Sequence, residues 1–536
     1  MPPPKDPSDL SRAELEGEVA ALRGEVSELE LLAAALRDGM ARLKGLKPRP
    51  VIKPSGMEKA TEPPRGGKRG KRRGRGKVTP LAAVEAEVLR VTAPPGSQFK
   101  GYEPYHVQFK GYEPYHVQDL VLTARVLRYR RERWLTPEGA AIVAPLPGGV
   151  RGHFGPELRR FVPMRYHPGQ VTVERLVTRL QAFGVSISKR HVMRLRIDRQ
   201  DDFLAEDREV LRAGLRSAAW ITVDDTGARH RGADAVCTRI GNGSFTWFGT
   251  TGSKSRLNFL ELLRADHTDY VVNDAALDYM REHALAGPIV RQPAGHPQRH
   301  FASAAAWQHH LEQLGITALQ VAPDPVRVAT EGALWGAIAD HGFPHEAVIV
   351  SDDAGQFQVG QHALCWIHAE RLVHKLETFT DQQRAARQLV RGLIWWFYAD
   401  LKAYRLAPTS RRRSETRARF ERIFLRTTGF VMLDRLLQRL HANKAELLLV
   451  LDRPEIPLHT NSSENDIRCH VTKRQVSGGT KTDIGRDCRD AFLGLAKTCQ
   501  ELGVAFWNYL GARLGVAGSP AVPRLADLIR CRGQPA

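Results

Sequence analysis

The chain has 536 residues, and its formal net charge of +20 and pI near 9.9 favour a polyanionic partner, with nucleic acid as the first candidate. The sequence has no run of about 18 apolar residues and no apolar signal core at its start, so we expect no membrane span, no secretion and a cytoplasmic location. The six cysteines are scattered without a CxxC pair, which argues against a disulfide framework and a zinc ribbon.

A leucine heptad opens the chain over residues 1–46. The pattern predicts a coiled coil and a homo-oligomer, and the alternative is an amphipathic helix that packs on its own protein. The leucines that recur at every seventh position are Leu15, Leu22, Leu29, Leu36 and Leu43.

Residues 47–95 are rich in proline, glycine and positive charge, which predicts a disordered linker. Such a segment can add salt-sensitive, sequence-independent DNA affinity, and the alternative is a solvated spacer. The cations expected to contact phosphates are Lys68, Arg69, Lys71, Arg72, Arg73, Arg75 and Lys77.

Residues 96–160 are expected to form a small β unit with a turn at 137–139. The segment FKGYEPYHVQ occurs at 99–108 and again at 109–118, which is typical of a tandem duplication rather than a solenoid. One copy is expected to bulge out as a loop.

Residues 161–200 have the spacing of a helix-turn-helix. Apolar residues such as Leu176 line a first amphipathic helix, Gly184 ends it, and Ser188 is the expected N-cap of a second. This pattern favours DNA recognition, and the alternative is a purely structural helical hairpin. The cations expected to face DNA are Lys189, Arg190 and Arg194.

Residues 215–512 are expected to form a catalytic domain around three carboxylates. Asp224 and Asp352 each end a short apolar run that predicts a buried strand, and Glu464 opens a predicted helix. A strand with a terminal aspartate, followed by a hairpin that turns at Asn242-Gly243, is typical of the start of an RNase H-like fold. A helical insertion is expected at about 370–452, and a C-terminal tail at 513–536.

Three acidic groups with open positions suit Mg²⁺, with Mn²⁺ as the alternative ion, and two such ions can drive in-line attack at phosphorus. Asp224 is the candidate bridging ligand, and Asp352 and Glu464 each complete one metal site. The alternative is that each aspartate is a turn residue or a helix cap. Asp225 and Asp353 are expected to point to the other side of their strands.

The segments VDDTGARH, VSDDAGQF, HALCWIHAERLVHKL and LHTNSSENDIR resemble the catalytic blocks of insertion-sequence transposases of the sixty-six family. The resemblance implies a DDE transposase with an RNase H-like mixed sheet and a helical insertion, in a multidomain α/β protein. The family's acidic triad falls on Asp224, Asp352 and Glu464, and its Cys-Trp-x-His block falls on Cys365, Trp366 and His368. Many relatives carry a cysteine-rich zinc element before the catalytic domain, whereas this chain has no cysteine before Cys237, so no zinc is expected.

The expected function is cleavage and strand transfer at the ends of a mobile element, with terminal and target DNA as partners. Accessory proteins of the same element are a further class of partner. A silent DNA-binding regulator and a stand-alone nuclease are the alternative functions. Cys365 and His368 are expected to pack near the active site, and the aromatic residues at 395–398 in the core of the insertion. The cations near Glu464 expected to contact phosphate, rather than form a solvated face, are Arg468, Lys473 and Arg474.

Overall fold

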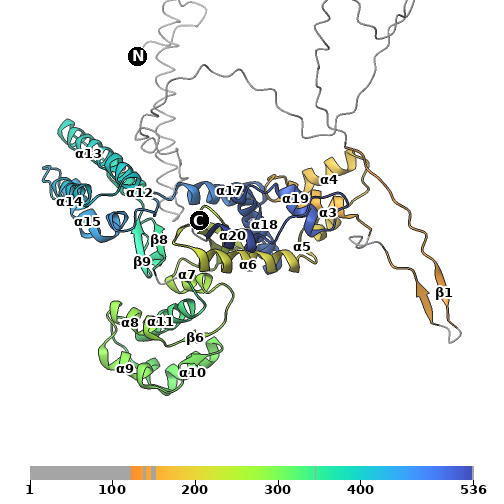
Figure 1. Cartoon of the computed structure of the whole chain (residues 1–536), viewed down its shortest axis with the longest axis horizontal. Helices are drawn as coiled ribbons and strands as arrows, with labels where there is room; N and C mark the ends of the chain where they lie inside the picture. Colours follow the sequence, from red (N-terminus) through yellow and green to blue (C-terminus); the bar gives the residue numbers. More distant parts are fainter. Residues whose placement is uncertain (1–121, 137–139, 147–152, 344–345, 534–536) are drawn as a thin grey trace, which may run out of the picture. The chain divides into compact units, whose positions relative to one another are not determined.

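The computed structural model describes residues 122–136, 140–146, 153–343 and 346–533 (Figure 1). The expected coiled coil over 1–46, the basic linker over 47–95 and both decapeptide copies lie outside these residues. Within the described ranges, no helix has the length and apolar composition needed to cross a membrane.

A short hairpin comes first in the described part of the chain. β1 (Arg133–Leu135) pairs antiparallel with β2 (Ala141–Val143) on either side of 137–139. The expected antiparallel β unit is therefore confirmed for this segment.

A three-helix unit follows, and its elements are α3 (Pro156–Tyr166), α4 (Val173–Ala182) and α5 (Lys189–Ile197). Its small core includes Leu176 and Val192, which are fully buried. Gly184, with φ of +87°, follows the end of α4, and the Ser188 side chain accepts the His191 N–H at the start of α5. The two helices predicted from the pattern at 173–197 are confirmed.

The central sheet has the strand order β5-β4-β3-β8-β9. Its strands are β3 (Trp220–His230), β4 (Ala233–Gly241), β5 (Thr246–Thr251), β8 (Val348–Ser351) and β9 (Gln361–Leu364). β3, β4 and β5 form an antiparallel meander, whereas β8 and β9 run parallel to β3. The Asn242 N–H donates to the Phe245 carbonyl at 2.9 Å, so the hairpin turn lies where the sequence predicts it.

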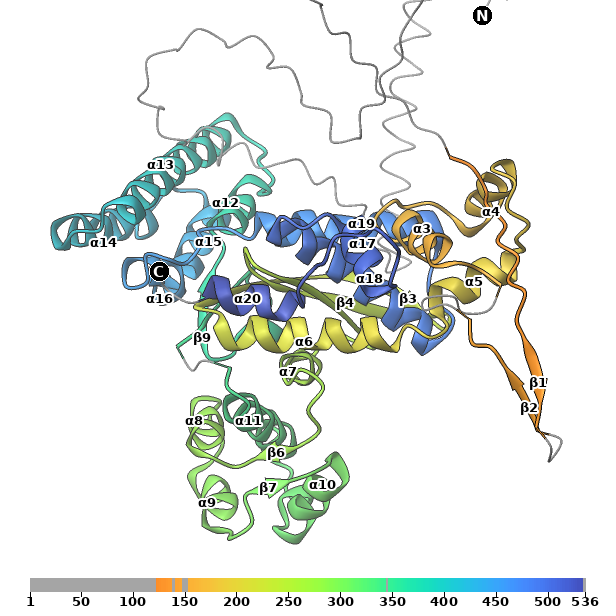
Figure 2. The ribbon, with the colours of Figure 1, turned by 45° about the vertical axis from the view of Figure 1, so that its right-hand side comes forward.

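Helices cover both faces of this sheet (Figure 2). The side chain of Arg239 on β4 reaches one face, and the next residue, Ile240, lies in the apolar core on the other face. The helices that pack on or beside the sheet are α6 (Asp201–Ser217), α17 (Asn461–Ser477), α18 (Asp483–Leu502), α19 (Phe506–Arg513) and α20 (Leu525–Gly533). The segment expected to be a C-terminal tail therefore contains a helix, and buried Leu525 and Ile529 join it to the core because α20 packs on α6.

The chain between β5 and β8 folds into a smaller group of helices with a two-stranded sheet. Its elements are α7 (Arg256–Leu263), β6 (Tyr270–Val271), α8 (Asp274–Glu282), α9 (Gly287–Gly295), β7 (His300–Phe301), α10 (Ala304–Gln313), η2 (Ile316–Ala318) and α11 (Pro325–Asp340). β6 and β7 pair antiparallel, and α11 packs on α7, α8 and β6. Apolar residues of these helices are continuous with the core of the main sheet.

The chain between β9 and α17 is helical, as the sequence predicts for the stretch expected to be an insertion. The elements of this stretch are α12 (Trp366–His374), α13 (Asp381–Leu406), α14 (Ser410–Phe424), α15 (Val431–Ala442), α16 (Lys444–Leu447) and η4 (Leu449–Leu451). A short helix, η3 (Gly355–Phe357), lies before it, between β8 and β9. Phe397 and Tyr398 are fully buried, as expected, but Trp396 is 71% exposed because neighbouring residues of α13 face different sides of the helix.

Candidate active site

Asp224 lies within β3, at the point where this strand loses one neighbour. β8 pairs with β3 from Trp220 to Thr222, while β4 continues beside β3 as far as His230. The apolar run that Asp224 ends predicts that the strand also ends there, and this boundary is wrong because antiparallel pairing with β4 extends the strand to His230. Asp224 therefore lies just beyond the parallel pairing with β8.

Asp352 directly follows β8, as expected, and its carboxyl group is close to that of Asp224. Burial, and then the negative charge of Asp352, raise the pKa of Asp224 to about 7. Burial also raises the pKa of Asp352, against the opposing effect of His368. The Oδ1 atom of Asp352 is buried and has no hydrogen-bond partner. The two aspartates thus share a partly dehydrated site in which one carboxylate oxygen of Asp352 has no hydrogen-bond partner.

Glu464 is the fourth residue of α17 and is only 7% exposed. Arg371 of α12 donates two hydrogen bonds to it, from Nη1 to Oε1 at 2.5 Å and from Nη2 to Oε2 at 3.1 Å. Such a bidentate pair is the stronger class of charge-assisted hydrogen bond. Glu464 is therefore held by the insertion as well as by its own helix.

His368 lies beside all three carboxylates. Its Nε2 is 3.5 Å from Oε1 of Glu464, and its charge acts on both Asp224 and Asp352. Burial would lower its pKa, but Cys365, Asp352 and Glu464 together raise the pKa to about 9. Burial would raise the pKa of the Cys365 thiol, but His368 outweighs burial and lowers it to about 7. The expected packing of Cys365 and His368 near the site is confirmed, and His368 supplies a positive charge at its centre.

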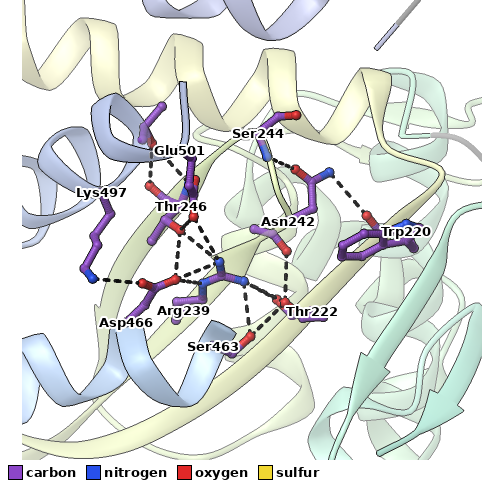
Figure 3. Close-up of polar contacts among 12 residues, drawn as sticks. Trp220, Thr222, Arg239, Asn242, Ser244, Thr246, Ser463, Asp466, Lys497 and Glu501 are labelled. Carbon is purple, nitrogen blue, oxygen red and sulfur yellow. Dashed lines mark hydrogen bonds and ion pairs between the residues drawn. The ribbon is translucent and has the colours of Figure 1, made fainter. Parts of the chain in front are cut away.

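Arg239 is fully buried and connects α17 to the sheet (Figure 3). Its Nε and Nη2 donate to Oδ2 of Asp466 at 3.1 and 2.9 Å, and its Nη1 donates to Ser463 at 3.2 Å. The same guanidinium group donates to Thr222 of β3 at 2.7 Å and to Thr246 of β5 at 2.8 Å. Since Ser463 and Asp466 flank Glu464 in the sequence, this network fixes where Glu464 lies relative to β3.

The acidic residues that follow the two aspartates have other partners. Asp225 forms an ion pair with Lys254 and accepts a hydrogen bond from Gln356 at 2.8 Å. Asp353 forms an ion pair with Arg439 of α15. Because β3 continues past Asp225, its side chain alternates away from that of Asp224, as expected.

The chemistry of this site fits a divalent cation. Carboxylate oxygens are the ligands that Mg²⁺ prefers, and the buried Oδ1 of Asp352 lacks a partner that a cation would supply. The residues that would hold the ion are Asp224, Asp352 and Glu464. Because Arg371 occupies both oxygens of Glu464, it would have to release at least one of them.

The residues expected to bind DNA differ in how far they are exposed to solvent. Lys189, Arg190 and Arg194 are exposed on α5, and Lys189 pairs with Glu174 at 2.5 Å. Arg468 is partly buried and donates to Asn465 at 3.3 Å, and Arg474 is also partly buried. The seven cations of the linker, at 68–77, lie outside the described residues.

The expectation of a phosphate contact at Lys473 is wrong. Its side chain is 1% exposed, donates to the Tyr166 carbonyl, and has its Nζ 3.2 Å from the centre of the Tyr166 ring. Arg196 of α5 covers the same ring at 3.3 Å. Lys473 therefore joins α17 to the three-helix unit instead of facing solvent, because the inward face of α17 is polar.

Sequence reasoning did not single out Arg239, Arg371 or Lys254. Arg371 has a local signal, since it lies three residues after His368 and shares a face of α12 with it. Arg239 and Lys254 have none, because their partners are distant in the sequence.

Residues 336–487 match the family model described as "Transposase IS66 family". The chain is also 50% identical, over 323 residues, to "Uncharacterized protein y4jO" of Sinorhizobium fredii. That match covers 60% of this chain and the whole of the relative. No solved structure matches the chain.

Proposed function

Because this chain belongs to the IS66 family of transposases, we propose that it is a DNA transposase that cuts the ends of a mobile element and joins them to target DNA. The observation that carries the proposal is the grouping of Asp224, Asp352 and Glu464 around His368. These carboxylates come from β3, from the end of β8 and from α17, which are far apart in the sequence. The matched region contains two of the three.

The strand order supports an RNase H-like catalytic core for this enzyme. An antiparallel meander of three strands, followed by two strands parallel to the first, is the arrangement of that fold, and here it is β5-β4-β3-β8-β9. In this proposal the helices from α12 to η4 are an insertion between the second aspartate and the glutamate.

Asp224, Asp352 and Glu464 would hold Mg²⁺, which supplies charge stabilisation to the attacking and leaving oxygens of a phosphodiester. The side chains of the site control its charge and its geometry. Asp224 loses the proton that its raised pKa keeps on it at acidic pH. His368 limits the repulsion among the carboxylates, and Arg371 keeps Glu464 oriented. Once Arg371 releases Glu464, its guanidinium group is free to contact a phosphate of the bound strand.

DNA binding is assigned to two regions. The exposed cations Lys189, Arg190 and Arg194 on α5 would contact the element ends, with α4 and α5 as a helix-turn-helix. Arg468 and Arg474 would contact DNA nearer to the carboxylates. The linker cations at 68–77 would add non-specific affinity, and the heptad at 1–46 would bring two chains together.

A strand-transfer assay tests the proposal. Short duplexes with the element's terminal sequence are incubated with the full chain and a supercoiled target, with and without Mg²⁺. We expect cleaved and joined products only with Mg²⁺, and none from Asp224→Asn, Asp352→Asn or Glu464→Gln, all of which should still bind the ends. Binding without cleavage in the wild type would indicate a regulator, and cleavage without joining would indicate a nuclease, so either result contradicts the proposal.

A matched control is Asp353→Asn. Asp353 follows Asp352 in the sequence but pairs with Arg439, so its carboxylate lies outside the proposed metal site. This variant should retain cleavage and joining. Loss of both activities in Asp353→Asn would show that acidic residues here act through the fold, not as ligands.

A further inference from the structure

Three histidines and one aspartate converge in the region between β5 and β8, apart from the proposed catalytic carboxylates. His267 lies in the loop after α7, and Asp269 directly precedes β6. His300 is the first residue of β7, and His341 follows the last residue of α11. Three separate segments, which are the α7–β6 loop, β7 and the end of α11, therefore bring these side chains to one place.

The distances within this cluster are those of a compact site. Nε2 of His341 is 2.8 Å from Oδ1 of Asp269, and Nε2 of His300 is 3.1 Å from Oδ2 of the same carboxylate. The candidate ligand atoms of His267, Asp269 and His341 all lie within 4.8 Å of one another. Two ligand atoms at zinc–nitrogen or zinc–oxygen bond length in a tetrahedron are roughly 3.3 Å apart, so binding one ion would draw these atoms together and turn one of the stacked rings of His267 and His341.

Within the described ranges, the position of the His267 ring is set by stacking and not by a hydrogen bond. Its ring stacks on the His341 ring with centroids 3.5 Å apart and an interplanar angle of 9°. Within the described ranges, neither ring nitrogen of His267 takes part in a hydrogen bond or ion pair. Two protonated imidazoles would repel each other at this distance, so at least one of the rings keeps a lone pair that a metal can use.

We propose that His267, Asp269, His300 and His341 form a structural Zn²⁺ site. Imidazole nitrogen and carboxylate oxygen are ligands of Zn²⁺, and four of them complete its tetrahedral coordination. Asp269 supplies the negative charge, and it is 8% exposed, whereas the His300 side chain is 61% exposed and leaves a route for the ion. The proposal does not depend on transposase activity.

Two arginine side chains near the cluster donate hydrogen bonds to backbone carbonyls. Nε of Arg212 donates to the Ala265 carbonyl at 3.0 Å, and Nε of Arg216 donates to the His341 carbonyl at 3.0 Å. Both arginines thus hold the backbone that carries the histidines, and Asp269 stands between the imidazoles. A bound ion would connect the loop after α7, the β6–β7 sheet and the end of α11.

A second group of potential ligands is less suited to a metal. Cys237 and His470 are fully buried and Asp490 is 4% exposed, and Nε of Arg489 already donates to Asp490 at 2.9 Å. A cation there would meet the guanidinium group directly. The cluster around Asp269 is the one we assign to zinc.

The full chain, stripped with a chelator and dialysed, is titrated with Zn²⁺ alone, and bound zinc is measured per chain together with the midpoint of thermal unfolding. The tested variants are His267→Gln and His300→Gln, which change partly exposed side chains, and His341→Gln. His309→Gln on α10 is the matched control, because His309 is exposed and its ring forms a hydrogen bond with Gln313 of the same helix.

We expect the wild type and His309→Gln to bind one more tight Zn²⁺ per chain than the three ligand variants. Affinity at that site should fall at least about tenfold in each ligand variant. Zn²⁺ should also raise the unfolding midpoint of the wild type but not of His341→Gln. Equal zinc content and equal midpoints in wild type, ligand variants and control would overturn the proposal and leave a hydrogen-bonded cluster.

Discussion

Replacing Arg239 with methionine tests whether the buried network holds α17, and with it Glu464, against the sheet. Methionine keeps an apolar stem of similar length but removes every donor of the guanidinium group. Asp466 would keep Lys497 at 3.2 Å and the Thr246 hydroxyl at 3.0 Å as partners, and Ser463 would lose one donor. The Asp466 carboxylate would remain buried with fewer hydrogen-bond donors around it.

The expected cost follows from the burial of this pair. The side chains of Arg239 and Asp466 are 0% and 8% exposed, so solvent screening does not reduce the interaction. Removing one partner of such a pair costs about 3–5 kcal/mol. Since about 1.4 kcal/mol changes an equilibrium constant tenfold, local opening of α17 should become roughly 100- to 4,000-fold more frequent.

Native-state hydrogen exchange resolved by helix measures this directly. Amides of α17 should exchange faster in Arg239→Met, and those of α13 in the insertion should not change. Arg411→Met is the control, because the Arg411 side chain is 88% exposed and pairs with Glu415 on the surface of α14. Exchange of α17 at the same rate in Arg239→Met and Arg411→Met would refute the idea that this network holds the helix.

Two further predictions concern pH. Burial, and then the charge of Arg196, lower the pKa of Lys473 from 10.5 to about 7. Between pH 7 and 10.5 the folded chain therefore binds fewer protons than the unfolded chain, so the free energy of unfolding should rise with pH across this window. Denaturant midpoints at pH 7 and 9.5 should show that rise in the wild type and a smaller one in Lys473→Met, and an identical rise in both would contradict the burial of an ammonium group here. The pKa shift of Asp224 has the opposite effect on stability. Its pKa is raised from 3.8 to about 7, so its contribution to the stability of the metal-free chain is lost as pH rises through 7. Below pH 7, Mg²⁺ must displace the proton of Asp224 in order to bind. Calorimetric Mg²⁺ affinity should be roughly tenfold lower at pH 6 than at pH 8, and equal affinities would show that Asp224 is not a ligand.

The parts of the fold that could be predicted are those with a local signal. Short apolar runs marked β3 and β8, and the Asn242-Gly243 turn marked the β4–β5 hairpin. Ser188 and Gly184 marked the boundaries between α4 and α5. The three carboxylates could be picked out because each stands at the edge of such an element.

The parts that could not be predicted depend on contacts between distant residues. The apolar run predicts the end of β3 too early, because antiparallel pairing with β4 decides the length of this strand. A polar residue on a helix usually faces solvent, so the sequence predicts Lys473 at the surface. The buried face of α17 is instead polar, with Ser463, Asp466 and His470 besides Lys473. Arg239 lies 227 residues from its partner Asp466, so no local pattern identifies it.

In the proposed function, Asp224, Asp352 and Glu464 hold the metal that drives strand cleavage. Asp352→Cys would show whether Asp352 is a ligand, because a thiolate is a poor ligand for Mg²⁺ and a better one for softer ions such as Mn²⁺. On terminal duplexes the variant should still bind, should give no cleavage with Mg²⁺, and should regain cleavage with Mn²⁺. Cleavage by Asp352→Cys in Mg²⁺ at the wild-type rate would contradict the assignment.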